Sequence, residues 1–201
     1  MANLTRYLKL LEAVRPTIVV ATGPAGTSKT YSACHVGTRR VQAGQYDRLV
    51  LTRPAVSAGE EIGYLPGTLE EKMMPWIQPC IDAIGLPAFR KLSQAGKIEI
   101  CPIAFMRGRT FENCYIVADE MQNATKSQLV MALTRIGFDS KFVLTGDLDQ
   151  CDNQHSGLSD LVSRLRDNQT EEVMHVQFDK TEIRRHPVVK QVLDLYFLDS
   201  Q

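Results

Sequence analysis

The sequence predicts an α/β fold in three layers, with a mainly parallel sheet between two layers of helices. Short apolar runs alternate with amphipathic stretches along the 201 residues, a pattern typical of parallel strands covered by helices. The first apolar run leads into a glycine-rich loop that contains a lysine and a threonine. A later run, at 115–118, ends in two adjacent acids, where open α/β sheets commonly bind ligands.

Six segments are expected to form strands, because each is short and rich in apolar or β-branched residues. They are 17–22, 48–52, 98–103, 115–118, 141–145 and 173–178, of which 98–103 carries the weakest signal. Helices are expected at 29–43, 127–136, 157–166 and 188–197. Leu8, Leu11 and Val14 mark a short amphipathic helix within the N-terminal segment 1–16. The length favours a single domain over 1–201.

The segment 56–66 carries glycines, two adjacent glutamates and the pair Tyr64-Leu65. It is interpreted as an ordered functional loop or a partner-facing insertion, and a plain surface loop is the alternative.

The bulk composition excludes several classes of protein. Lysine and arginine balance aspartate and glutamate at 23 each, so net charge does not indicate nucleic-acid binding, although a local basic patch could. The apolar runs are too short to cross a bilayer, and the first 15 residues do not resemble a signal peptide, so a cytoplasmic protein with no membrane partner is expected. The cysteines form no CxxC pair and the four histidines have no ligand spacing, which favours buried reduced thiols over a metal or disulfide framework. The cysteines are Cys34, Cys80, Cys101, Cys114 and Cys151.

The loop after the first predicted strand has the pattern of a Walker A phosphate loop. Its successive residues are Gly23, Pro24, Ala25, Gly26, Thr27, Ser28, Lys29 and Thr30, followed by Tyr31. Backbone N–H groups at the start of the next helix form an anion site, and the two glycines permit the turns. Lys29 would contact the β- and γ-phosphates of ATP, and Thr30 would offer its hydroxyl to Mg²⁺. Ser28 stands where glycine is usual, and its Cβ disfavours a positive φ.

The acids after the strand at 115–118 complete the pattern. Asp119 would hold the Mg²⁺ shell, and Glu120 would orient or deprotonate the attacking water. After the strand at 141–145, Gln150 could bind both a γ-phosphate oxygen and that water, while Thr145 and Asp147 could steady the loop. Solvated acids at a strand end and a simple Gly-Asp turn are the structural alternatives. With the phosphate loop, these residues predict a RecA-like P-loop NTPase.

Several segments together resemble the PhoH family, relatives of the superfamily 1 helicase core. They are GPAGTSKT at 23–30, LTRPAVSAGEEIGYLPG at 51–67, CPIAFMRGRTFENCYIVADEMQN at 101–123, LTRIGFDSKFVLTGDLDQ at 133–150 and RRHP at 184–187. The resemblance implies a RecA-like core, ATPase activity with ATP and Mg²⁺, assembly into a ring homo-oligomer, expected to be a hexamer, and association with RNA or single-stranded DNA. The chain is similar to the minimal, phage-type form of the family, and a phage protein of this kind would act in the host cytoplasm. Leu4 departs from the family, where relatives often carry a glutamine that could read adenine.

Arginines are the remaining candidates for function. A single core lacks the second domain that supplies a transition-state arginine in helicases, so the arginine would come from the same core or a neighbouring subunit. Arg184 and Arg185 are the candidates, and the family match favours Arg185. Three others, Arg53, Arg107 and Arg109, could contact phosphates of nucleic acid or nucleotide, or form structural ion pairs. Phe105, Phe111 and Tyr64 could stack on bases, although packing is the simpler interpretation.

A helicase-like, nucleic-acid-associated ATPase is thus the leading hypothesis, and three alternatives remain. A small-molecule kinase would need an acceptor site and a lid. A nucleotide-gated scaffold would bind nucleotide but retain only vestigial hydrolysis, and Ser28 in place of the usual glycine is consistent with that alternative. A metal-dependent nuclease would use Asp119, Glu120, Asp147 and Asp149 as a cluster.

Overall fold

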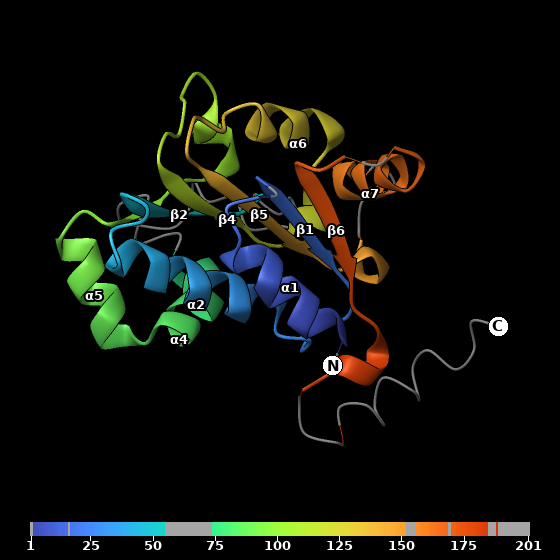
Figure 1. Ribbon diagram of the computed structural model, residues 1–201, viewed down its shortest axis with the longest axis horizontal. Coiled ribbons are helices and arrows are strands. Elements are labelled where there is room, and N and C mark those ends of the chain that lie inside the picture. The colour runs from blue at the N-terminus through green and yellow to red at the C-terminus, as the bar shows by residue number, and fades with distance from the viewer. Residues whose placement is uncertain are drawn as a thin grey trace.

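The computed structural model describes residues 2–15, 17–54, 74–151, 156–168, 170–184 and 188, and its centre is a six-stranded sheet (Figure 1). The strands lie in the order β3-β2-β4-β5-β1-β6, and every neighbouring pair is parallel. Their bounds are β1 Ile18–Thr22, β2 Arg48–Thr52, β3 Ile98–Ile100, β4 Cys114–Ala118, β5 Lys141–Gly146 and β6 Val173–Gln177. The predicted parallel sheet is therefore confirmed.

Helices cover both faces of the sheet (Figure 1). One face carries α1 (Ala2–Glu12), α2 (Lys29–Gln42), α4 (Gln78–Ile84) and α5 (Leu86–Gln94), and the other carries α6 (Lys126–Leu133) and α7 (Gly157–Asp167). Short 3₁₀ turns connect these elements: η2 Met74–Ile77, η3 Ile103–Met106, η4 Met121–Asn123, η5 Leu148–Gln150 and η6 Lys180–Glu182. The chain has the predicted RecA-like α/β fold.

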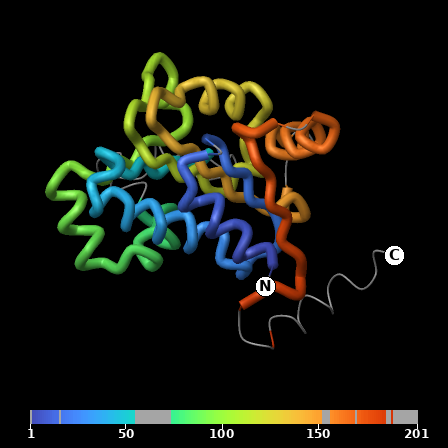
Figure 2. The backbone as a smooth tube through the Cα atoms, viewed as in Figure 1, coloured from blue at the N-terminus to red at the C-terminus, as the bar shows by residue number. Residues whose placement is uncertain are grey.

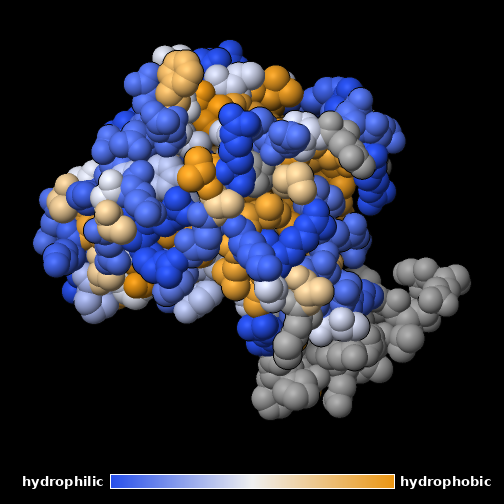
Figure 3. Space-filling view, in the orientation of Figure 1, coloured by the Kyte–Doolittle hydropathy of each residue, from blue (hydrophilic) through white to orange (hydrophobic). Residues whose placement is uncertain are grey.

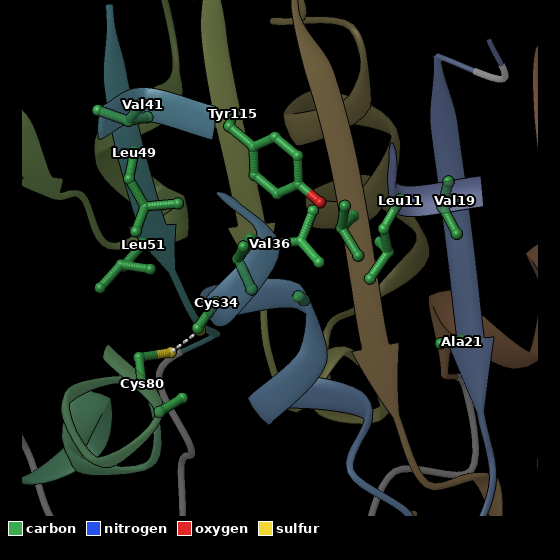
Figure 4. Packing of buried hydrophobic residues seen from close by; sticks show 14 of the residues in the cluster. Leu11, Val19, Ala21, Cys34, Val36, Val41, Leu49, Leu51, Cys80 and Tyr115 are labelled. Atoms are coloured by element: carbon green, nitrogen blue, oxygen red, sulfur yellow. Dashed lines mark hydrogen bonds between the residues drawn. The ribbon is translucent and has the colours of Figure 1, made fainter. Parts of the chain in front are cut away.

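The strands divide their side chains between two hydrophobic clusters, as the two-residue period of a strand requires. Val19, Leu49 and Val117 lie in the cluster beneath α1, α2 and α4, part of which is shown in Figure 4. Their sequence neighbours Val20 and Val50 point to the opposite cluster, beneath α6 and α7. Because both faces are buried, the central strands are almost entirely apolar.

Cysteines contribute to this packing. Cys34 of α2 and Cys80 of α4 are buried, with their Sγ atoms 2.7 Å apart (Figure 4). Burial raises the pKa of the Cys34 thiol well above its usual value. The five cysteines, all within the described residues, form no disulfide, and Cys151 is partly exposed while the other four are buried.

The N-terminal helix is joined to the phosphate loop and to the last described turn. The Tyr7 hydroxyl donates to the carbonyl of Lys29 at 3.2 Å, and its buried ring meets Phe178 edge to face. The Asn3 amide donates to Glu182 at 2.9 Å, so the start of α1 lies beside η6 (Figure 2). The predicted helix in segment 1–16 therefore supports the loop.

Several predicted boundaries differ from the structure. The strand predicted at 98–103 ends at Ile100, because Pro102 has no N–H to donate and the chain then turns into η3. The helix predicted at 127–136 begins at Lys126, after the capping box of Thr125 with Gln128, and ends at Leu133. Helices α4 and α5 were not predicted. The segment 56–66 and all of 188–197 except Val188 lie outside the described residues.

Hydrophilic residues cover most of the face seen in Figure 3, and hydrophobic residues form small scattered groups. Within the described ranges, no helix is both long and apolar enough to span a membrane.

Candidate nucleotide-binding site

A cleft of about 350 Å³ opens at the carboxyl ends of β1, β4 and β5. This edge is common to the three strands because β5 pairs with both of the others, with Thr22 opposite Gly146 and Ala118 opposite Leu144. The cleft is lined by Ala25, Gly26, Ser28, Lys29, Thr30, Tyr31, Pro79, Asp119, Glu120, Gly146, Asp147, Gln150 and Arg184. Residues from loops far apart in sequence thus meet at the edge where open parallel sheets bind ligands.

The phosphate loop turns where the sequence predicts a turn. Gly23 has φ +136°, and a Cβ there would lie 2.4 Å from the carbonyl oxygen of Phe178, so only glycine fits. Ser28, the last residue before α2, is left-handed with φ +66° and ψ +22°. The side chain of Ser28 makes no capping hydrogen bond. Ser28 therefore adopts the positive φ that its Cβ disfavours.

The Lys29 ammonium group is held by the loop itself. Its Nζ donates to the carbonyl oxygens of Gly23 at 2.7 Å and Pro24 at 2.8 Å, and lies 3.2 Å from Thr27 Oγ1. The side chain is buried among these oxygens at the base of the cleft. A positive charge is thus fixed where an anion would enter.

Asp119 directly follows β4, the acid strand, and connects this strand to the phosphate loop. Its Oδ1 accepts hydrogen bonds from Thr30 Oγ1 at 2.7 Å and Thr145 Oγ1 at 2.5 Å, and only 8% of the residue is exposed. Hydroxyl and carboxylate oxygens are the ligands that Mg²⁺ prefers in proteins. The Thr30–Asp119 pair therefore fits a magnesium ion bound beside phosphates.

Glu120, the next acid, leaves the strand through a left-handed turn with φ +55°. This turn sends its side chain into the cleft. Its Oε2 accepts a hydrogen bond from Gln122 Nε2 at 2.6 Å. The two adjacent acids thus have different partners, because Asp119 is hydrogen-bonded to the phosphate loop and Glu120 to the turn that follows it.

The turn after β5 contributes Asp147 and Gln150. Burial raises the pKa of the Asp147 carboxyl above its usual value, although the Lys29 ammonium and the backbone N–H groups of Asp149 and Ala25 oppose that effect. Gln150 is exposed at the rim of the cleft. These two residues place a carboxyl near the phosphate loop and an exposed amide at the cleft.

Of the arginines predicted from sequence, those within the described residues do not gather in one place. Arg184 lines the cleft, and its backbone N–H donates to the carbonyl of Gly26 at 2.8 Å, whereas Arg185 lies outside the described residues. Arg109 forms an ion pair with Glu99 at 2.5 Å and stacks over the Phe111 ring.

The remaining candidates for nucleic-acid contacts have mixed surroundings. Arg53 donates to the carbonyl of Trp76 at 3.3 Å, while Arg107 is exposed. Phe111 is buried, Phe105 is 59% exposed, and Tyr64 lies outside the described residues. Arg109 and Phe111 therefore have structural partners, and Arg107 and Phe105 remain accessible.

Three residues at the site were not proposed from sequence. Pro79 reaches the cleft from α4, a helix that the sequence pattern did not reveal. Gly146 packs directly against Gln122 and leaves no room for a side chain, because a Cβ there would lie 2.9 Å from Gln122 Oε1. Gln122 itself follows the acid pair by two residues and lies within the family-matched segment 101–123, and these are the signs that could have pointed to it.

A family profile and curated relatives match the sequence of this chain, and a solved structure resembles its fold. The profile of the family described as PhoH-like protein matches residues 2–197. The PhoH-like protein of Mycobacterium tuberculosis (strain ATCC 25618 / H37Rv) is 43% identical over 96% of this chain, and Protein PhoH of Escherichia coli (strain K12) is 36% identical over 94%. The chain spans 56% and 55% of these two relatives, about half their length. The large terminase of a thermophilic bacteriophage has a similar fold, with a TM-score of 0.60 at 12% identity over 96% of this chain and 49% of the terminase.

Proposed function

This chain belongs to the PhoH family, and from that premise we propose that it binds ATP with Mg²⁺ and hydrolyses the bond between the β- and γ-phosphates, releasing ADP and phosphate. The observation that carries the proposal is the hydrogen bond between Thr30 and Asp119, because it joins the phosphate loop to the acid strand in one cleft. In P-loop NTPases these two residue types hold the metal that neutralises the phosphates. The cleft is therefore the proposed catalytic centre.

Nucleotide binding would use backbone and side-chain groups together. The N–H groups of the phosphate loop and the start of α2 would bind the phosphates, and Lys29 would exchange its loop carbonyls for phosphate oxygens. Tyr31 is 54% exposed at the edge of the cleft and stacks flat against His35, so its ring is available to the adenine.

Magnesium would be held by the Thr30 hydroxyl and the Asp119 carboxylate, together with phosphate oxygens. When bound, the ion supplies charge neutralisation for the transferring phosphoryl group. Thr145 holds the shared carboxylate in place through its own hydrogen bond to Asp119 Oδ1.

Hydrolysis would rely on two residues at the mouth of the cleft. Glu120 would accept a proton from the attacking water, and the Gln150 amide would orient that water against the γ-phosphate. Lys29 would stabilise the negative charge that develops on the phosphate oxygens. No acceptor other than water is required, which distinguishes this reaction from that of a kinase.

The finer parts of the function concern assembly and partners. We propose that copies of the chain form a head-to-tail ring, expected to be a hexamer, in which Arg185 of one subunit approaches the γ-phosphate held by the next. Arg184 is already at the cleft of its own subunit and is the candidate if the arginine acts within one chain. Single-stranded RNA or DNA is the proposed partner, contacted by the exposed Arg107 and by Arg53, and a cytoplasmic location is proposed.

One experiment tests this function against its alternatives. Phosphate release from ATP is measured at steady state with and without single-stranded RNA and DNA, beside a mass measurement of the assembly in solution. Hydrolysis without any added acceptor supports the ATPase, and stimulation by a single strand supports the nucleic-acid partner. Tight ATP binding without turnover would indicate a nucleotide-gated scaffold. Strand cleavage that persists without nucleotide would indicate a nuclease.

A further inference from the structure

Gln122 connects the turn after β4, which contains Glu120, to the turn after β5, which begins at Asp147. Its Nε2 donates to Glu120 Oε2 at 2.6 Å, and its Oε1 accepts the backbone N–H of Asp147 at 3.2 Å. The residue is 2% exposed, so both ends of one buried carboxamide are used. A buried amide with both ends satisfied holds a defined orientation, because rotation would leave polar groups without partners.

The same residue contacts the far end of the turn after β5. Its backbone carbonyl accepts the Cys151 thiol at 3.4 Å. Gly146, the residue that precedes Asp147, lies so close that a Cβ would come within 2.9 Å of Gln122 Oε1 and 3.2 Å of its backbone nitrogen. The turn that contains Gln150 is therefore held by Gln122 at both ends.

The short contact to Glu120 has a chemical consequence. A hydrogen bond to an ionised carboxylate is stronger than a neutral one, and it fixes the carboxylate by one of its two oxygens. The bond holds Oε2 in a fixed direction and thereby orients the whole carboxylate, whose oxygens can still accept a proton from water. The turn 147–150 that carries Gln150 is called the sensor turn, and the N–H of its first residue, Asp147, is held by the other end of the same amide.

We propose that Gln122 is a positioning residue that couples the water-activating Glu120 to the turn that carries Gln150. The inference rests on the proposed ATPase function and adds to it. Through Gln122, a movement of the sensor turn would reorient Glu120, and a movement of Glu120 would be transmitted to the turn. The base and the sensor would therefore be in position for hydrolysis together.

The first test uses steady-state kinetics of three variants. Gln122→Leu removes both hydrogen bonds and is expected to lower kcat by on the order of 10-fold or more, with the KM for ATP changed less than about twofold. Gln122→Glu keeps the shape but places a second acid against Glu120, so the acidic limb of the kcat–pH profile should move to higher pH. Gln128→Leu is the matched control, because Gln128 also hydrogen-bonds through its amide but caps α6 away from the cleft. It should lose stability and keep the parent's kcat and pH profile.

The second test does not depend on turnover. Hydrogen exchange of the peptide that contains residues 147–150 is measured in the parent, Glu120→Ala, Gln122→Leu and the double variant. Glu120→Ala should speed exchange of the Asp147 backbone N–H, because the Gln122 side-chain amide loses the carboxylate that holds it. In the double variant, the loss of Glu120 should add nothing to the effect of Gln122→Leu.

The outcomes separate the two proposals. If the parent hydrolyses ATP while both Gln122 variants retain its kcat and pH profile, the coupling is wrong and the ATPase assignment stands. If the parent does not hydrolyse ATP, the proposed function fails, and the hydrogen-exchange result alone decides whether Gln122 links the two segments. The coupling would also be overturned if the double variant exchanged faster than Gln122→Leu by the full effect of Glu120→Ala, because the two substitutions would then act independently.

Discussion

The hydroxyl of Thr30 donates to Oδ1 of Asp119 at 2.7 Å, although 89 residues separate the two in sequence. The contact forms because β1, β5 and β4 are adjacent and end at the same edge of the sheet. It places a hydroxyl and a carboxylate where a magnesium ion could bind both.

Asp119→Asn should reduce Mg²⁺-dependent hydrolysis about 10- to 100-fold, because asparagine can still accept the Thr30 hydroxyl but no longer carries the charge that attracts the cation. ATP binding in the absence of magnesium should change little. Titration of activity with Mg²⁺ is the measurement, and the variant should need more of the ion. Unchanged magnesium dependence would show that Asp119 is not a metal ligand.

Glu120→Gln is expected to keep nucleotide binding and lose on the order of 100-fold or more in kcat, since the amide cannot accept the proton of water. Binding is measured with a fluorescent ATP analogue and turnover by phosphate release. Parent-like turnover would mean that another group is the base. Loss of binding would mean that Glu120 contributes to the nucleotide site itself.

Ser28→Gly should bind ATP at least as tightly as the parent. Ser28 holds a left-handed conformation that costs a residue with a Cβ roughly 1 kcal/mol, and its side chain makes no cap that would be lost. The matched control is Ser32→Gly within α2, where a helical residue becomes glycine and stability should fall by about 0.5 kcal/mol. Affinity is measured by calorimetry. A clear loss of affinity in Ser28→Gly would indicate that the serine hydroxyl is itself a ligand.

Lys141→Met should change how stability depends on pH. Burial, together with nearby Arg40, lowers the pKa of Lys141 to about 8, although Glu12 and Glu172 oppose the shift. Between about pH 8 and the ordinary lysine value, the unfolded chain binds a proton that the folded chain lacks, so Lys141 makes the protein more stable as pH rises and this gain is lost as pH falls to about 8.

Unfolding in urea between about pH 7.5 and 10.5 measures this effect. The free energy of unfolding of the parent minus that of Lys141→Met should increase across the interval. A difference that stays constant with pH would show that Lys141 titrates normally.

Arg185→Ala should bind ATP and turn over slowly, because an arginine finger can contribute on the order of 10³-fold in rate. Mixing it with Lys29→Ala should restore part of the activity if the arginine acts on the neighbouring subunit, since mixed interfaces can pair an intact loop with an intact arginine. Arg184→Ala is the comparison within one chain. Stably mixed rings without any rescue, or a fully active monomer at high dilution, would contradict the trans arrangement.

The phosphate loop and the acid strand could be predicted from the sequence, because their signals are local. Glycines, a lysine and a threonine follow one apolar run, two acids follow another, and each cluster occupies a short stretch of chain. Apolar runs also predicted the parallel sheet, since strands buried on both faces must be almost entirely apolar. The helices α4 and α5 were not predicted, and Pro79 was missed with them. Helix α4 is only seven residues long, whereas α5 does carry apolar residues at helical spacing, at Leu86, Phe89 and Leu92.

The relationships within the cleft could not be predicted, because they depend on which strands are neighbours. The position of β5 between β1 and β4 brings Asp147 to Gln122 and Thr145 to Asp119, and no local pattern specifies that order. Arg109 shows the same limit: the sequence left open a phosphate contact or a structural ion pair, and the fold supplies Glu99 as the partner of an ion pair. Local chemistry in the sequence therefore determined which residue types are present at the site. Only the packing of distant segments decided which atoms meet, since hydrogen bonds and ion pairs form over a few ångströms and the chain must fold before those distances exist.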